Sequence, residues 1–211
     1  MSVKFHEAFC LDSARRRFEF TDHFLGDSVR DLWRSTGDAG GSAVVVDAQD
    51  GGVCRISTGA TTNDDWRIDW GVIRSLHILK KVTMEWRMKA INSTYITLTT
   101  GLHFDGSNLA WFHCAHDASG NWFIRCIDDG SSTNVSSGVA VDTDWHIFRI
   151  ECCPTGEVHY YIDGAETANS PIITDIPSDA ADYLQPYFSI LTREDVAKSM
   201  DIDYIWVRQD R

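Results

Sequence analysis

Histidine and cysteine side chains lie close together in one stretch of the sequence, where they could bind a transition metal or pair a nucleophile with its base. His113, Cys114 and His116 are neighbours, and His103 precedes them. On a strand, His113 and Cys114 would point to opposite faces, and Cys114 would share a face only with His116. Two ligands are too few for a zinc site, which takes three or four, and no third residue is identifiable that would orient a Cys–His pair. We therefore expect no catalytic residue here, and metal binding is left undetermined.

Aromatic residues offer a second kind of chemistry, because flat rings beside polar groups can bind sugars. The chain has 8 tryptophans. Trp111 and His113 would stand on one face of a strand at 109–115, and Tyr95 would join them from a strand at 94–104. The candidate carbohydrate-binding residues are Tyr95, Trp111, His113 and Trp122. The alternative is a core packed with aromatic side chains, since the sequence alone does not say which face of each strand is buried.

The elements that must position these residues are β-strands. Apolar and polar residues alternate from Val82 to Met88, as expected of a strand with one buried and one wet face. The same alternation predicts a hairpin over 145–162, with a turn at 154–156, and a strand over 200–207. Further strands are expected at 43–47, 53–57, 66–70, 94–104, 109–115, 122–127 and 184–192, and one short helix at 27–34. Many short strands between turns rich in glycine and aspartate are typical of an all-β antiparallel sandwich or barrel.

The strands are expected to form one domain over residues 20–211, preceded by an N-terminal arm over residues 1–19. The arm lacks alternation and holds a basic run, Arg15, Arg16 and Arg17. It is either a solvated terminus or an arm that docks on an acidic neighbouring subunit, because the net charge of the chain is −12.

Composition argues against several classes of protein. Asp and Glu number 31 against 19 Lys and Arg, whereas sequence-independent binding of nucleic acid requires a basic surface. No apolar run approaches the roughly 20 residues of a membrane-spanning helix, and the first residues do not resemble a secretory signal. We expect neither nucleic acid nor a membrane as a partner. The 6 cysteines form no C-x-x-C pair, so we expect mostly free thiols, with three disulfides as the alternative.

Three stretches of the sequence resemble one known family. Residues 142–164, DTDWHIFRIECCPTGEVHYYIDG, are similar to paired strands of concanavalin A-like lectin/glucanase (laminin G-like) domains. Residues 200–209, MDIDYIWVRQ, are similar to their closing strand. Residues 20–59 resemble the opening of versions found in bacteriophage virion proteins, with a D-x-F-x-G start and the strand DGGVCRISTG. The resemblance implies a jelly-roll sandwich of two antiparallel sheets, with the first and last strands adjacent. This fold hosts enzymes, lectins and structural modules alike.

Hydrolases of this superfamily carry alternate carboxylates on one strand, which serve as nucleophile and general acid. Glu85 is followed two positions later by Arg87 rather than by a second carboxylate. Asp201 and Asp203 share a strand face about 7 Å apart, but no glutamate accompanies them, and we expect them to face solvent or anchor a loop. The chain is therefore expected not to be an enzyme of this type.

Calcium is the one cofactor that the resemblance leaves open, because several relatives of this fold bind it through loop carboxylates. The candidate loops are 47–50, 63–65 and 128–129. None has the ligand spacing of a defined calcium loop. We expect no other cofactor.

The main interpretation is a non-enzymatic structural or interaction protein of a bacteriophage virion, made in the host cytoplasm. We expect a head-decoration protein, or a tail or appendage protein, that docks through its N-terminal arm. Its expected partners are other virion proteins and further copies of the chain, since symmetric homo-oligomers are the default. The alternative is a lectin-like module that binds host-surface glycans, and a glycoside hydrolase is the interpretation with least support.

Overall fold

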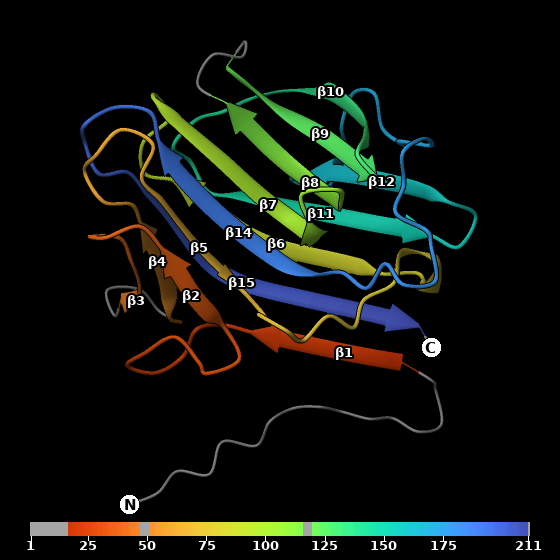
Figure 1. Ribbon diagram of the computed structural model, residues 1–211, viewed down its shortest axis with the longest axis horizontal. Helices are drawn as coiled ribbons and strands as arrows, with labels where there is room; N and C mark the ends of the chain where they lie inside the picture. The colour runs from red at the N-terminus through yellow and green to blue at the C-terminus, as the bar shows by residue number, and fades with distance from the viewer. Residues whose placement is uncertain (1–16, 47–50, 116–119, 211) are drawn as a thin grey trace, which may run out of the picture.

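The computed structural model describes residues 17–46, 51–115 and 120–210 (Figure 1). Over these ranges the chain forms two antiparallel β-sheets and one turn of 3-10 helix, η1 (Ile78–Lys80). The expected all-β sandwich is confirmed. No helix in the described part of the chain is long and apolar enough to cross a membrane.

Sheet A has the strand order β13-β12-β11-β6-β15-β4-β3, and β1 pairs with β15 beside it. The first and last strands are therefore neighbours, as the resemblance implied. The strands of sheet A are β1 (Arg17–Asp22), β3 (Ser42–Val46), β4 (Val53–Ser57), β6 (Thr83–Ala90), β11 (His146–Cys153), β12 (Glu157–Ile162), β13 (Ala165–Glu166) and β15 (Ser199–Asp210).

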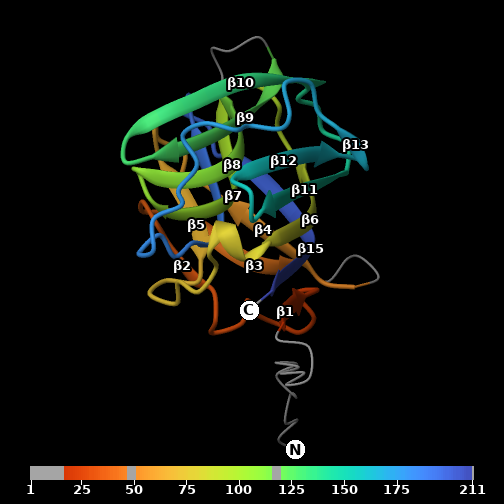
Figure 2. The ribbon, with the colours of Figure 1, turned by 90° about the vertical axis from the view of Figure 1, so that its right-hand side faces the viewer.

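Sheet B has the strand order β10-β9-β8-β7-β14-β5-β2. Its strands are β2 (Arg34–Gly37), β5 (Asp65–Asp69), β7 (Ile96–Asp105), β8 (Asn108–Ala115), β9 (Asn121–Asp128), β10 (Ser131–Ala140) and β14 (Gln185–Thr192). Figure 2 shows the two sheets as two layers, with β7, β8 and β9 in one and β6, β11 and β12 in the other.

The core lies between the two layers and is built from aromatic rings. Trp86 of sheet A is fully buried and stacks on Phe148, with ring centroids 5.7 Å apart. Phe112 and Phe188 of sheet B meet Trp86 edge-on at 5.9 and 5.8 Å. Edge-to-face contacts of this kind add to the gain from burying apolar area. The buried residues form one continuous cluster, and the side of a strand that contributes to this cluster is its inward side.

The short helix expected at 27–34 is wrong: these residues form bends and turns, and β2 begins at Arg34. Tertiary contacts outweigh the local helix tendency. Trp33 Nε1 donates a hydrogen bond to Oδ2 of the buried Asp22 at 2.9 Å. The backbone N–H of Phe24 donates to the other oxygen of Asp22 at 2.9 Å. Asp22 thus ties this segment to the end of β1.

The first strand, β1, begins at Arg17, three residues before the expected start of the domain at residue 20. Arg17 pairs with Asp210 of β15, and its Nε lies 3.7 Å from the Asp210 carboxylate. Arg17 is therefore part of the sandwich rather than of a separate arm. Arg15, Arg16 and the preceding residues lie outside the described residues.

The prediction of free thiols is confirmed for the cysteines that the structure describes. Cys54, Cys114, Cys126 and Cys152 are buried, and Cys153 is partly exposed. None of these five forms a disulfide. Cys10 lies outside the described residues.

Candidate functional site

The outer face of sheet B carries two neighbouring rows of side chains that cross the sheet. Phe112, Ile124 and Phe188 point into the core, so the residues on either side of each of them point outward. Strand register aligns the first row as Arg34, Asp69, Tyr187, Gly101, Trp111, Arg125 and Asn134. It aligns the second as Thr36, Arg67, Ser189, Thr99, His113, Phe123 and Ser136. We call this outer surface of sheet B the groove face.

Three rings on the groove face form what we call the aromatic cluster: His103, Trp111 and Tyr187. His103 stacks on Tyr187 with ring centroids 4.3 Å apart. It lies nearly parallel to Trp111, at 5.8 Å and 4°. Trp111 and Tyr187 belong to strands on either side of β7, about 9.5 Å apart by strand spacing, yet their centroids are only 6.1 Å apart. They approach because Gly101, which lies between them in the row, has no side chain.

Polar atoms around this cluster are buried but lack a hydrogen-bond partner among the described residues. They are His103 Nδ1, Trp111 Nε1, Arg67 Nε, Arg125 Nε and Gln185 Oε1. All five residues lie on the groove face, since Gln185 pairs directly with His103. A buried polar group without a partner costs free energy, and most such groups in proteins bond to protein, water or ligand. Arg67 and Arg125 are partly exposed, so their guanidinium groups have further N–H donors that can bond to water or to a ligand.

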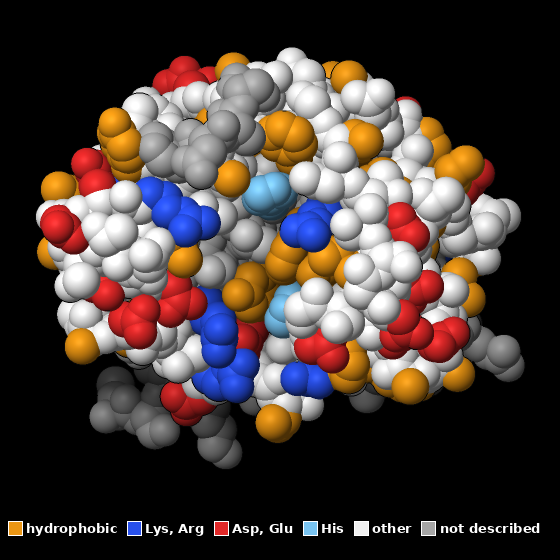
Figure 3. All heavy atoms as spheres, turned by 45° about the horizontal axis from the view of Figure 1, so that its top comes forward, with side chains coloured by type: hydrophobic (Ala, Val, Ile, Leu, Met, Phe, Trp, Pro, Cys, Tyr) orange, Lys and Arg blue, Asp and Glu red, His pale blue; other side chains and the backbone are white. Residues whose placement is uncertain are grey.

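The two histidines of the groove face are neutral at neutral pH. Burial lowers the pKa of His103 to about 4. Burial, and then the charge of Arg125, also lower the pKa of His113. Neutral imidazoles can donate or accept hydrogen bonds and do not repel nearby arginines. Figure 3 shows a hollowed face of the molecule where two histidines and several Lys or Arg side chains surround apolar ones.

One carboxylate of the first row is neutralised within the chain. Asp69 is 1% exposed. Arg34 donates to its two oxygens at 2.9 and 2.7 Å, and this hydrogen bonding raises the pKa of Arg34. The backbone N–H of Gly71 donates to the same carboxylate at 2.7 Å. Asp69 therefore anchors β2 to β5 and has little freedom to act as a nucleophile.

Among the described residues, the strands of the groove face do not present the carboxylate pair that a glycoside hydrolase needs. Strands β7, β8, β9 and β14 carry only Asp105 and Asp128, each at the end of its strand. Asp105 accepts hydrogen bonds from the next turn, through the N–H of Ser107 at 2.8 Å. On β5, Asp65 and Asp69 are four residues apart, about 13 Å along a strand, beyond the 9.5 Å limit for inverting enzymes.

The sequence-predicted binding residues divide into three groups. Trp111 and His113 lie on the groove face, as expected. Trp122 does not: it is 2% exposed and its ring packs edge-on to Phe148 in the core at 4.9 Å. It does not belong with the candidate binding residues, because its side of β9 faces the core and the opposite side faces the groove. Tyr95 is 46% exposed just before β7, and its carbonyl accepts a hydrogen bond from the N–H of Arg193.

Sequence analysis missed most of the groove face. Tyr187 and Arg67 were not considered, His103 was considered only as a metal ligand, and Arg125 was not considered. Alternation in DWRID and in NWFIRCID could have indicated Arg67 and Arg125 as outward-facing residues. Nothing in the sequence indicated that Tyr187 lies beside the strand that holds Gly101.

The expectation that His113 and Cys114 diverge agrees with their placement. Cys114 is 4% exposed and belongs to the core, and burial raises its pKa to about 12. His113 lies on the groove face, beside Phe123. His116 lies outside the described residues.

The carboxylates of β15 are paired rather than solvent-facing, which corrects the expectation. Asp201 is 3% exposed, and Arg55 of β4 donates to its two oxygens at 2.8 and 2.9 Å. Asp203 accepts a hydrogen bond from Arg87 at 2.6 Å. Both lie on sheet A, away from the groove face. Glu85, also on sheet A, accepts a hydrogen bond from the Tyr204 hydroxyl at 2.8 Å.

Two of the three acidic loops considered for calcium lie among the described residues. Residues 47–50 lie outside the described residues. In loop 63–65, Asp64 accepts a hydrogen bond from the N–H of Thr61 at 2.9 Å. Burial, and then the charge of Asp129, raise the pKa of Asp128. In the described part of these loops no three His, Cys, Asp or Glu side chains bring ligand atoms within 4.8 Å of one another, and calcium binding stays an untested expectation.

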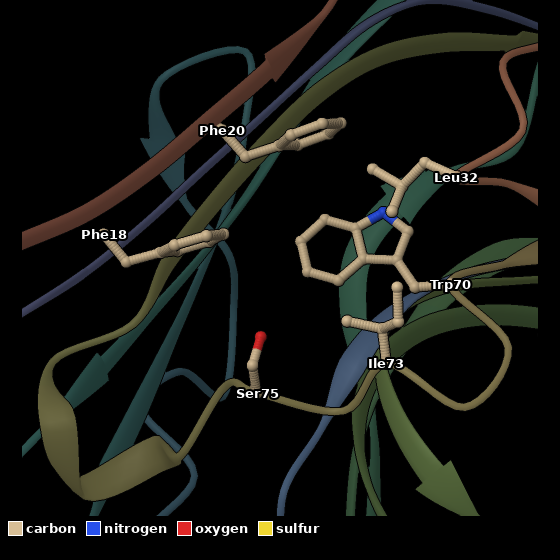
Figure 4. Close-up of a pocket in the computed structure, with 6 residues that line it drawn as sticks. All are labelled: Phe18, Phe20, Leu32, Trp70, Ile73 and Ser75. Atoms are coloured by element: carbon tan, nitrogen blue, oxygen red, sulfur yellow. The ribbon is translucent and has the colours of Figure 1, made fainter. Parts of the chain in front are cut away.

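A small apolar cavity of about 130 Å³ opens beside β1 (Figure 4). It is lined by Phe18, Phe20, Leu32, Trp70, Ile73 and Ser75. Its polar side-chain groups are the hydroxyl of Ser75 and the indole N–H of Trp70. This cavity lacks the converging polar groups that orient a ligand, so the groove face is the better candidate site.

Comparison with known proteins shows the fold. No family model matches the chain, and no curated protein matches it. Several solved structures are similar. One is a protein of unknown function from Shewanella oneidensis, with a TM-score of 0.68 at 13% identity over 92% of this chain and 86% of that one.

Two further similar structures come from mycobacteria. An immunostimulatory antigen and pseudo β-1,3-glucanase of Mycobacterium tuberculosis has a TM-score of 0.68 at 14% identity, over 91% of this chain and 98% of that one. A glycosyl hydrolase family 16 protein of Mycobacterium smegmatis has a TM-score of 0.66 at 13% identity, over 89% and 98%. At these identities the similarity establishes the fold alone. The chain is therefore a jelly-roll sandwich like those of glucanase-like proteins.

Proposed function

We propose that this protein is a carbohydrate-binding module that binds a polysaccharide along the groove face without hydrolysing it. The observation that carries the proposal is the aromatic cluster, His103, Trp111 and Tyr187, surrounded by buried polar atoms that lack partners. Ligand sites combine apolar rings with a few placed polar groups in this way. The lectin-like alternative of the sequence analysis thus has more support than the virion interpretation.

Each part of the groove face has a role in this proposal. The C–H face of a sugar ring packs against the exposed parts of Trp111 and Tyr187, which removes apolar surface from water. The partly exposed guanidinium groups of Arg67 and Arg125 donate hydrogen bonds to sugar hydroxyls, directly or through bridging water. The neutral His103 packs against both larger rings, with its ring centroid 4.3 Å from that of Tyr187 and 5.8 Å from that of Trp111.

The absence of hydrolysis is supported by the carboxylates. A retaining enzyme needs two carboxyl groups about 5–5.5 Å apart across the scissile bond. Asp69 is held by Arg34, and Asp105 is held by its own turn. One of the similar mycobacterial structures is itself described as a pseudo β-1,3-glucanase.

The test is a binding titration of the purified full chain with a soluble β-1,3-glucan and with a uronate-containing polysaccharide, followed by calorimetry. We expect one of them to bind and Trp111→Ala to weaken its binding at least tenfold, about 1.4 kcal/mol. Trp145→Ala is the matched control, because Trp145 is a partly exposed tryptophan that packs against Arg87 and Lys89 on sheet A. Its affinity should equal that of the wild type.

Two results would overturn the proposal. If neither polysaccharide binds, or if both tryptophan variants bind as the wild type does, the groove face is not a glycan site. Release of reducing sugar in proportion to protein concentration would contradict the non-enzymatic part alone.

The virion assignment stays a prediction that rests on the resemblance of residues 20–59. The similar structures named above are bacterial proteins, and they neither support nor oppose a phage particle. A glycan-binding groove would suit a protein displayed on a particle that meets a cell surface. Assembly through the N-terminal segment remains to be measured, as described in the Discussion.

A further inference from the structure

A mixed set of metal-ligand side chains lies at the β11–β12 hairpin, on sheet A. Cys153 of β11 pairs directly with Glu157 of β12. His159 is two residues beyond Glu157, on the same face of its strand. One ligand atom from each of these three residues lies within 4.8 Å of the others. It is the one such group of three in the described part of the chain.

The histidine of this group is oriented by a second carboxylate. His159 Nδ1 lies 2.7 Å from Glu166 Oε1. The Ser170 hydroxyl donates a hydrogen bond to the same oxygen at 2.9 Å, so Glu166 Oε1 is held between Ser170 and His159 Nδ1. Nε2 then carries its lone pair toward Glu157, whose Oε2 is 3.9 Å away, too far for a hydrogen bond. A carboxylate that fixes the far nitrogen of a ligand histidine is the usual support of a zinc site.

The other two ligands are also positioned. Thr155 donates a hydrogen bond to Glu157 Oε2 at 3.3 Å. Arg149 binds the nearby Glu151 at 3.0 Å, which leaves Glu157 without an arginine partner among the described residues. The Cys153 thiol is partly exposed, so an ion can reach it from solvent.

We propose that Cys153, Glu157 and His159 bind a Zn²⁺ ion, with water in the fourth position. Thiolate sulfur, imidazole nitrogen and carboxylate oxygen are the three donors that zinc takes, whereas calcium and magnesium take oxygen alone. Ligand atoms around a tetrahedral zinc lie roughly 3.3–3.7 Å apart by its bond lengths. The group therefore closes on the ion by small side-chain rotations, without movement of the hairpin.

Binding requires the Cys153 thiol to lose its proton to solvent. A bound dication stabilises the thiolate. Zinc binding should therefore release a proton and weaken as the pH falls.

The experiment uses Co²⁺ as a spectroscopic substitute for Zn²⁺, added to the full chain at pH 7.5. A thiolate bound to cobalt produces a near-ultraviolet charge-transfer band, and we expect this band to appear and to be removed by added Zn²⁺. Cys153→Ser should abolish the band, and His159→Gln should weaken cobalt binding at least tenfold. Glu166→Gln removes no ligand but should still weaken binding about 10- to 100-fold.

The matched control is His146→Gln. His146 also lies between two carboxylates, with Asp163 at 2.6 Å and Asp142 at 3.0 Å, but it has no cysteine in its group. Its substitution should leave the cobalt band unchanged. Cys10→Ser should also leave it unchanged, which excludes the cysteine outside the described residues as its source.

The proposal is overturned if the wild type shows no thiolate band, or if the band survives Cys153→Ser. Equal loss in His146→Gln and His159→Gln would also overturn it, because it would indicate binding to any surface histidine. Circular dichroism of each variant confirms that a lost band is not a lost fold.

Discussion

Trp122 and Trp111 lie on adjacent strands but on opposite faces of sheet B, so replacing each with alanine should change stability by different amounts. Trp122→Ala removes a ring that is 2% exposed and that packs against Phe148 at 4.9 Å. Truncation of a buried tryptophan costs about 3–5 kcal/mol, which is a large part of the 5–15 kcal/mol by which domains are stable. For a chain of this length, each kcal/mol lowers Tm by about 2–4 °C, so we expect a decrease of roughly 6–20 °C.

Trp111→Ala should cost much less. The ring lies on the partly exposed groove face, and its neighbours there are His103 and Tyr187. An aromatic pair contributes about 0.5–1.5 kcal/mol beyond buried area, so the loss should be about 1–2 kcal/mol. The same substitution should remove polysaccharide binding, which Trp122→Ala can affect only by unfolding the protein.

The assay is urea unfolding followed by tryptophan fluorescence and circular dichroism, with the calorimetric binding titration on the same samples. Trp122→Phe is the control, because it keeps an aromatic ring in the core and deletes an indole N–H that has no hydrogen-bond partner among the described residues. It should restore most of the stability. Equal loss of stability in the two alanine variants would refute the assignment of the two faces of sheet B, and with it the groove.

Three further predictions concern pH, a buried ion pair and the N-terminus. Because the pKa of His103 is lowered from 6.5 to about 4, the unfolded chain binds this proton more readily. The free energy of unfolding should therefore fall between pH 6.5 and 4, by up to about 3 kcal/mol, and the fall should be smaller in His103→Gln when both are measured by urea titration. Arg55→Met leaves the buried Asp201 carboxylate poorly compensated and should cost about 3 kcal/mol, whereas Arg55→Met with Asp201→Leu should recover most of it in the same assay. Deletion of residues 1–16 should leave Tm unchanged, while deletion of residues 1–19 should lower Tm because it cuts β1. If light scattering shows that the full chain is an oligomer, and the oligomer persists after deletion of residues 1–16, the basic segment is not an assembly arm.

All the strands that the sequence predicted are present, and four of them were indicated by strong alternation. β6, β11, β12 and β15 alternate apolar and polar residues because one side of each faces the core and the other faces solvent. β10 was missed, since its sequence, SSTNVSSGVA, is mostly polar and it lies at the edge of sheet B with little apolar surface to bury. The segment at 27–34 was misassigned because the contacts of Trp33 with Asp22 are tertiary and outweigh local propensity.

The proposed metal ligands at the β11–β12 hairpin show how much of a site can follow from local sequence. Cys153, Glu157 and His159 lie within one predicted hairpin, and the turn at 154–156 sets their register. The predicted hairpin already brought these residues onto neighbouring strands. Orientation of His159 by Glu166 depends on β13 pairing with β12, and the sequence did not indicate that strand.

Sequence by itself determined that this chain is an all-β antiparallel sandwich or barrel with aromatic strands, because burial on one face imposes a period of two. It did not determine which face of each strand is buried. A shift of one residue moves a side chain to the opposite face. Trp111 pairs with Arg125, so both face outward. Trp122 lies an odd number of residues from Arg125 along β9 and therefore faces the core. The groove face likewise required the pairing of β14 with β7, which brings Tyr187 beside Gly101 and Trp111. Only the tertiary structure decides such pairings, because they join distant segments whose hydrogen bonds and packing form together.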